Sequence, residues 1–207
     1  STLDLSTITP TFKNGYSGTA WTKTTGAGSI SGTTYTVGAG TATLTVDATT
    51  LASPAPSIST SNTTKIFGAS ATTLTATQST VYDSGVSVNY AFGESTSASG
   101  TYTYGTASTA TTTSIGAEHH YGTRYYKVKA YATDGILTSS EVTWSSSMNV
   151  KLTAATITFN ANNGTLNGTS PRYAKKGATT LYTTNTGTTS ATAPTARVIN
   201  KVVRSMF

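Results

Sequence analysis

The chain has 207 residues, a mass of 21.2 kDa and a formal net charge of +6, and it contains no cysteine. The lack of Cys excludes disulfides, thiolate metal sites and cysteine nucleophiles, and no run of about 20 apolar residues is present that could span a membrane. The net charge is positive because acidic residues are few. It indicates weak attraction to anionic surfaces such as cell-wall polymers or lipid headgroups. It does not indicate nucleic-acid binding, because no basic helix or aromatic RNA-reading motif accompanies it.

Threonine makes up about a quarter of the residues, and only 10% of the residues are charged. A β-branched residue suits the solvent-exposed face of a pleated sheet, while twelve Tyr, five Phe and two Trp can supply small packed cores. We therefore expect an all-β chain whose threonines occupy exposed strand positions. An O-glycosylated stalk and an ice-binding Thr array are the alternatives, but the second needs a strict short repeat that the sequence lacks.

Residues 1–51 predict a short β-rich module, complete or partial, with Trp21 and Tyr35 as candidate core residues. Its last strand is predicted over residues 40–47, where apolar residues alternate with threonines from Ala42 to Val46. This ending resembles the last strand of many bacterial immunoglobulin-like repeats. Residues 52–57 contain two prolines among small residues and predict an extended, semi-rigid linker.

Residues 58–152 predict a β-sandwich, because short strand-like segments recur with turn signals about every ten residues. The segments are residues 65–67, 72–77, 84–92, 100–104, 111–115, 125–133 and 137–145.

The clearest pattern in this region is a hairpin. Tyr126, Val128, Ala130 and Ala132 fall on one face of a strand, and Lys127, Lys129 and Tyr131 fall on the other. Asp134-Gly135 supplies a turn, and a second strand then carries Val142 and Trp144 to the first face. The pattern resembles the last two strands of a fibronectin type III or related bacterial immunoglobulin-like domain. The resemblance implies that Tyr126 is the inward tyrosine of the penultimate strand.

Residues 153–207 carry a second resemblance. Ala155 to Thr165 is followed by Pro171-x-Tyr173 and Lys176-Gly177, which is similar to the Listeria–Bacteroides repeat, the internalin B-type repeat of bacterial surface proteins. The resemblance implies a small β-grasp-like module, usually found in tandem arrays on secreted or wall-attached proteins. Ile157 and Phe159 would share one face of its opening strand, and Asn163-Gly164 would form the hairpin turn. The aromatic strand that completes the repeat is missing after Thr195, so we expect an incomplete module.

The last residues form an amphipathic tail that we expect to dock on the protein's own core or on a neighbouring subunit. Its apolar residues recur at helical i, i+3, i+4 spacing, with Arg197, Lys201 and Arg204 on the opposite side. A strand, or a basic helix on a membrane surface, is the alternative. The candidate docking residues are Val198, Ile199, Val202, Val203, Met206 and Phe207.

The sequence offers little catalytic chemistry, and we expect no enzyme activity, no cofactor and no metal site. The seven acids are scattered singly, without a calcium-binding run or a visible carboxylate pair. His119 and His120 are adjacent and would point to opposite faces of a strand, so they cannot easily share one metal. Lys65, Glu94 and Asn149 stand in an order that suits the isopeptide bond of some bacterial sandwich domains.

These observations predict a non-catalytic structural or adhesive segment of a secreted or cell-surface bacterial protein. One alternative is a self-assembling extracellular fibre or lattice subunit, because an open module with exposed edges can pair with a neighbour. The other is a glycan-binding module. The partner would be a cell-wall or host-surface glycan or protein, or the chain itself. The candidate partner-binding residues are Tyr102, Tyr104, Tyr121, Tyr125 and Tyr131.

Overall fold

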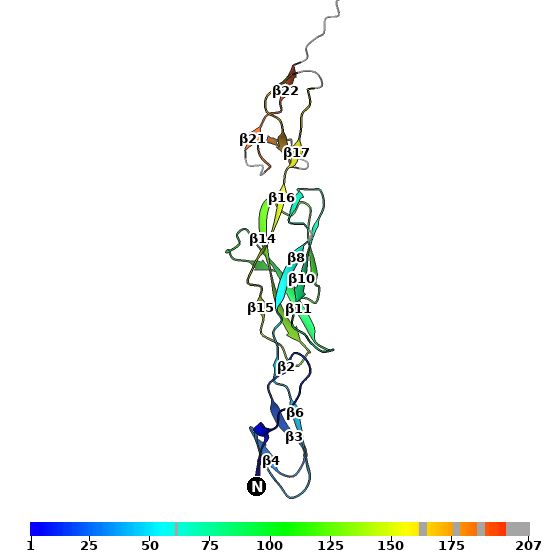
Figure 1. The fold of residues 1–207 in the computed structure, drawn as a ribbon, viewed down its shortest axis with the longest axis vertical. Coiled ribbons are helices and arrows are strands. Elements are labelled where there is room, and N and C mark those ends of the chain that lie inside the picture. The colour runs from blue at the N-terminus through cyan, green and yellow to red at the C-terminus, as the bar shows by residue number, and fades with distance from the viewer. Residues whose placement is uncertain (61, 162–164, 176–178, 186–188, 198–207) are drawn as a thin grey trace, which may run out of the picture.

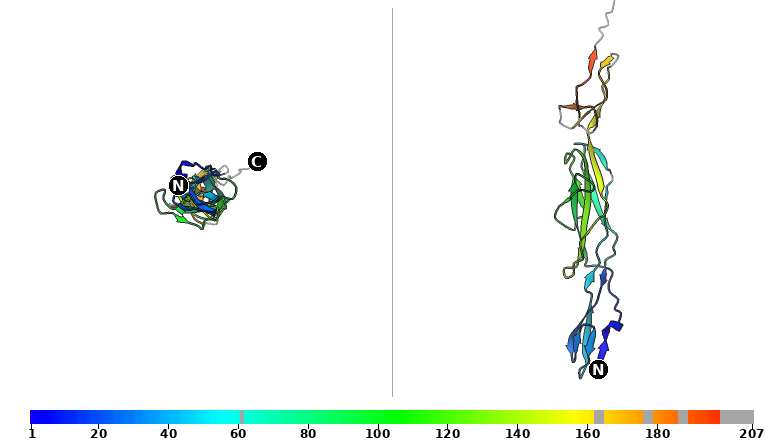
Figure 2. Two further views of the ribbon diagram at one scale, coloured as in Figure 1. Left: turned by 90° about the horizontal axis from the view of Figure 1, so that it is seen from below. Right: turned by 90° about the vertical axis from the view of Figure 1, so that its left-hand side faces the viewer.

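The computed structural model shows an all-β chain whose modules follow one another along a single long axis (Figure 1). The molecule is narrow when it is viewed along this axis (Figure 2, left). The side view shows its three modules one after another (Figure 2, right). No helix among the described residues has the length and apolar character needed to cross a membrane. The structure describes residues 1–60, 62–161, 165–175, 179–185 and 189–197.

The first module consists of three small antiparallel sheets, β1-β5-β4, β3-β6 and β2-β7. Its buried residues are few. Leu5 is fully buried in a 3-10 turn, Leu51 is buried, and Tyr35 is buried and donates a hydrogen bond to the Ala27 carbonyl at 2.6 Å. Trp21 is only half-buried, so Tyr35 belongs to the predicted core and Trp21 lies at its margin. The elements are β1 (Thr2–Asp4), η1 (Leu5–Thr7), β2 (Tyr16–Ser17), β3 (Ala20–Gly26), β4 (Ser29–Ser31), β5 (Thr34–Thr36), β6 (Ala42–Asp47) and β7 (Thr50–Leu51).

The second module is sandwich-like. One sheet has the order β13-β10-β8, and the other has the order β12-β11-β14-β16-β9 with β15 paired to β14; β9 runs parallel to β16. The elements are β8 (Pro56–Thr60), β9 (Thr64–Ile66), β10 (Thr72–Gln78), β11 (Ser87–Ser95), β12 (Thr103–Tyr104), β13 (Thr112–Ile115), β14 (Gly122–Thr133), β15 (Val142–Thr143) and β16 (Met148–Thr153).

The hydrophobic core of the chain lies between these two sheets. Leu74 of the smaller sheet and Val128 and Val150 of the larger one are fully buried, and all three belong to one packed cluster. β10 shows a period of two, because Thr73 and Thr77 are exposed while Leu74 between them is buried. The predicted placement of threonine on the solvent face holds for Thr73 and Thr77, but not for Thr72, which is buried on the inward face of the same strand.

The predicted hairpin is present. The inward residues of β14, from Tyr126 to Ala132, are buried, and the residues between them are half-buried. Asp134 shapes the turn by accepting hydrogen bonds from the Ile136 and Leu137 amides at 2.8 and 2.7 Å. The second strand is shorter than predicted, since it pairs with β14 only at an isolated bridge between Thr133 and Thr138 and at β15.

Two strands of the sandwich were not predicted. The proline-containing segment 52–57 is not a free linker throughout, because Pro54 and Pro56 are buried and Pro56 begins β8. A proline is tolerated there because it is the first residue of an edge strand. The other unpredicted strand is β16, in which Val150 and Leu152 are buried and Lys151 between them is half-buried.

The third module contains a sheet of order β17-β19-β20-β21 and a separate pair, β18-β22. The opening strand pairs with β19 and not with β18, so the expected hairpin between residues 155–159 and the next strand is not seen. Its predicted turn, Asn163-Gly164, and the tail 198–207 lie outside the described residues. The elements are β17 (Ala155–Ile157), β18 (Thr165–Asn167), β19 (Arg172–Ala174), β20 (Leu181–Tyr182), β21 (Ser190–Ala191) and β22 (Thr195–Arg197).

Candidate functional site: module junctions and a polar cluster

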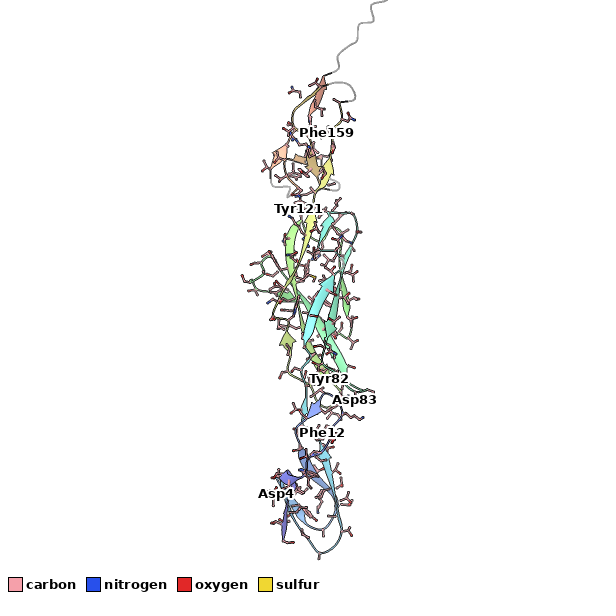
Figure 3. The ribbon with its side chains drawn as sticks, in the orientation of Figure 1. Asp4, Phe12, Tyr82, Asp83, Tyr121 and Phe159 are labelled. Carbon is pink, nitrogen blue, oxygen red and sulfur yellow. The ribbon has the colours of Figure 1, made fainter. Side chains whose placement is uncertain are left out.

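The junction between the first and second modules is held by side-chain hydrogen bonds. Asp83 accepts from the Asn14 amide at 2.8 Å, and Asp134 accepts from the Tyr16 hydroxyl at 2.8 Å. The Tyr82 hydroxyl donates to the Ala52 carbonyl at 2.7 Å. Figure 3 shows Tyr82 and Asp83 at the end of the sandwich that faces the first module. The pKa of the Asp134 carboxyl is lowered by the backbone amides of its own turn and by the Tyr16 hydroxyl.

Close packing at this junction depends on a glycine. Gly15 has a φ of +90°, and a Cβ at this position would lie 2.5 Å from the Tyr82 ring. Only glycine combines this backbone conformation with such a close approach. The tyrosine ring therefore rests directly on the backbone of the first module.

The junction between the second and third modules is nearly continuous β-structure. Ala154 is the only residue between β16 and β17; it is buried, and its amide donates to the Asn185 carbonyl at 3.1 Å. A one-residue connection leaves few backbone dihedrals free to change the angle between the modules.

Tyr121 joins the two sides of this second junction (Figure 3). Its hydroxyl donates to the Asn185 carbonyl at 2.7 Å, and its ring packs edge-on against Phe67 at 5.9 Å. The Lys175 ammonium of the third module lies 3.9 Å from the centre of the Tyr121 ring and 5.2 Å from that of Tyr182. Such a cation–π contact contributes about 0.5–2 kcal/mol, depending on its exposure.

The five candidate tyrosines do not form one line. Tyr121 belongs to the junction, and Tyr125 and Tyr131 lie on the half-buried outward face of β14. Tyr102 and Tyr104 are neighbours, with ring centres 6.3 Å apart. Their rings are approached by lysines of β14: Lys127 lies 5.2 Å from Tyr102, and Lys129 lies 4.6 Å from Tyr104. These lysines compete with a ligand for the ring faces.

Sequence reasoning missed a polar cluster around Glu94, at the end of β11. One Glu94 carboxylate oxygen lies 2.6 Å from His119 Nε2, and the other lies 3.2 Å from Arg124 Nε. Glu94 is opposite Tyr126 in the β11–β14 register, which brings it close to Arg124 near the start of β14. Glu94 and His119 are 25 residues apart in the sequence, and neither segment carries a local signal for their contact.

Two buried polar groups beside this cluster lack hydrogen-bond partners among the described residues. Neither ring nitrogen of His120 has one, and neither does the Tyr126 hydroxyl. His120 packs edge-on against His119 at 5.7 Å and lies 6.5 Å from the Tyr126 ring. Burial, followed by the negative charge of Glu94, raises the pKa of the Tyr126 hydroxyl well above its ordinary value. Within the described part of the chain, no three His, Asp or Glu residues are grouped closely enough to hold a metal ion.

The buried imidazole should make stability depend on pH. Burial first, and the positive charge of Arg124 second, lower the pKa of His120 below 6.5. As the pH falls below about 6.5, the unfolded chain takes up the proton before the folded chain does, so the free energy of unfolding decreases. Glu94 opposes this shift and His119 adds to it.

We expect that in His120→Phe, which keeps a buried ring, the free energy of unfolding decreases less as the pH falls below about 6.5. The measurement is urea denaturation at pH 7.5 and pH 5.5 for both proteins. An equal loss of stability in the two proteins on acidification would show that His120 does not carry the effect.

The structure does not bring the candidate isopeptide residues together. Lys65 Nζ donates to Ala71 O at 2.6 Å and to Ser70 Oγ at 3.1 Å. Glu94 is paired with His119 and Arg124, and Asn149 is exposed on β16 opposite Tyr125. Because Glu94 and Asn149 stand opposite adjacent residues of β14, they lie on opposite faces of the large sheet.

The fold thus defines an all-β protein with a β-sandwich-like central module. No family model, no curated protein and no solved structure matches the chain.

Proposed function

We propose that the chain is a non-catalytic spacer, a structural or adhesive segment of a secreted or cell-surface bacterial protein. The observation that carries the proposal is the pair of bonded junctions in an elongated chain of β modules (Figure 2). A spacer needs modules that resist bending relative to one another. Tyr82 packed on Gly15 and Lys175 packed on Tyr121 supply such resistance at the two junctions.

The surface chemistry supports an extracellular role. Hydroxyl side chains alternate outward on β10, and the chain carries few charges and no thiol to oxidise. The resemblance of the β14–β15 hairpin to fibronectin type III or immunoglobulin-like domains, and of residues 153–195 to the Listeria–Bacteroides repeat, fits the same proposal. Both groups of modules occur in tandem on surface proteins.

Sedimentation velocity over a range of concentrations tests the spacer role. We expect a monomer of 21.2 kDa with a frictional ratio well above that of a compact protein of equal mass. A mass that grows with concentration would replace the spacer with the self-assembling fibre or lattice subunit. In that case the first deletion to make is residues 197–207. A compact monomer would contradict both roles.

A further inference from the structure

The polar cluster around Glu94 lines two adjacent pockets of the central module. The outer pocket has a volume of about 560 Å³ and the inner one about 160 Å³. They share Glu94, Thr103 and His119. The two pockets therefore form one composite site with a polar outer part and a smaller inner part.

The outer pocket selects a neutral ligand rich in hydroxyl groups. The charges of Glu94 and Arg124 compensate each other at 3.2 Å, so neither is left to attract an ion. A carboxylate has about four acceptor positions and a guanidinium has five donors, so both groups can still bond to a ligand. Apart from His119, the remaining lining residues carry hydroxyls: Ser95, Thr96, Thr101 and Thr103. Vicinal hydroxyls of a sugar ring can donate to the carboxylate and accept from the guanidinium.

The inner pocket has different chemistry. Phe92, Ile115 and Tyr126 give it apolar walls beside Thr113 and Ser114, and it is the smaller of the two pockets. The Tyr126 hydroxyl is buried beside the Glu94 carboxylate and has no partner at full hydrogen-bond geometry among the described residues. An unmade hydrogen bond in a buried position is costly, and a ligand that completes it binds more tightly. A small group with one methyl and one amide matches these walls.

We propose that this composite site binds a 2-acetamido hexopyranose. The ring hydroxyls lie in the outer pocket against Glu94, Arg124 and the threonines. The acetamido methyl lies in the inner pocket against Phe92 and Ile115, with the amide directed toward Tyr126. The proposal goes beyond the spacer role and does not depend on it. It would give the spacer adhesion to N-acetylated glycans.

The test is titration of the full chain with two matched trisaccharides, followed by amide chemical shifts in NMR. One is a β-1,4-linked trimer of N-acetylglucosamine, and the other is the corresponding glucose trimer, which has a hydroxyl in place of each acetamido group. We expect saturable shifts at Glu94, Thr103 and Arg124 with the acetamido sugar, and binding at least about tenfold weaker for the glucose trimer. Equal binding of both sugars, or no saturable shift with either, would overturn the proposal.

A blocking variant locates the site. Thr103 is exposed and lines both pockets, so Thr103→Trp should fill the site without disturbing the core, and affinity for the acetamido trimer should fall at least about tenfold. Thr101→Trp, which narrows only the outer pocket, should weaken binding as well. The matched control is Thr73→Trp, at an exposed β-strand position outside both pockets. Unchanged affinity in both pocket variants, with native-like amide spectra, would contradict this location.

A peptidoglycan fragment serves as a second probe. Preference for this fragment over the simple trimer would assign the bacterial cell wall as the source of the sugar. Preference for the simple trimer would assign an unsubstituted acetamido glycan. Both results support the acetamido specificity, while failure of both probes to bind would count against it.

Discussion

Replacing Leu74 with Ala is expected to destabilise the central module by about 2–5 kcal/mol, the range for Leu→Ala in a packed core. Leu74 is fully buried in β10, where it belongs to the same cluster as Val128 and Val150 of the opposite sheet. Removing its side chain leaves a cavity that two hydrogen-bonded sheets cannot close. In a module of about 95 residues this corresponds to a fall in Tm of roughly 10 °C or more.

The unfolding of the central module can be followed separately from that of its neighbours. The chain has two tryptophans, and Trp144 packs against the sandwich core. In a Trp21→Phe background, Trp144 fluorescence reports on the central module alone. The matched control is Thr73→Ala, one residue earlier on the same strand and exposed, for which we expect a change within about 0.5 kcal/mol. Similar losses for the two variants would mean that the core is not where the fold places it.

Replacing Tyr121 with Ala is expected to uncouple the third module from the second while leaving the sandwich folded. The variant loses the hydrogen bond to Asn185, the edge contact with Phe67 and the cation–π contact with Lys175 together. Tyr121 precedes β14 and lies outside the packed core cluster, so the cost falls mainly on the junction. Amide ¹⁵N relaxation should show faster tumbling for residues 155–185 than for β14.

Two controls separate the junction from general effects. Tyr131→Ala removes a ring of the same size from the outward face of β14 and should leave the two modules tumbling together. Lys175→Arg keeps a cation over the Tyr121 ring, whereas Lys175→Met does not, so only the second should loosen the junction. Unchanged ¹⁵N relaxation in Tyr121→Ala would contradict the role of Tyr121. It would mean that the one-residue connection at Ala154 holds the second and third modules together.

Local periodicity explains why parts of the fold could be predicted. The alternation in β14 and the Asp134-Gly135 turn are properties of consecutive residues, and both appear in the structure. Strand pairing is a property of the whole chain. β8 could not be recognised, because Pro56 is normally a strand breaker. β16 alternates up to Leu152, but its pairing with β14 on one side and β9 on the other depends on distant residues.

The candidate site was harder to predict for the same reason. The sequence makes Tyr121 a candidate partner-binding residue, yet its partners lie 54 residues away in Lys175 and 64 residues away in Asn185. Glu94 and the His119-His120 pair were each identified, but nothing in either segment indicates the other. The β11–β14 register brings them together, and a register is not readable from one strand.

The central claim, that the chain is a rigid extended rod, is tested most directly by small-angle X-ray scattering of the full chain. A compact globule of 207 residues would have a radius of gyration of about 17 Å, and the unfolded chain about 50 Å. The account predicts a value clearly above 17 Å and below 50 Å, with a skewed distance distribution and a folded β-sheet circular dichroism spectrum. A radius of gyration near 17 Å would contradict it, because the modules would then be packed side by side.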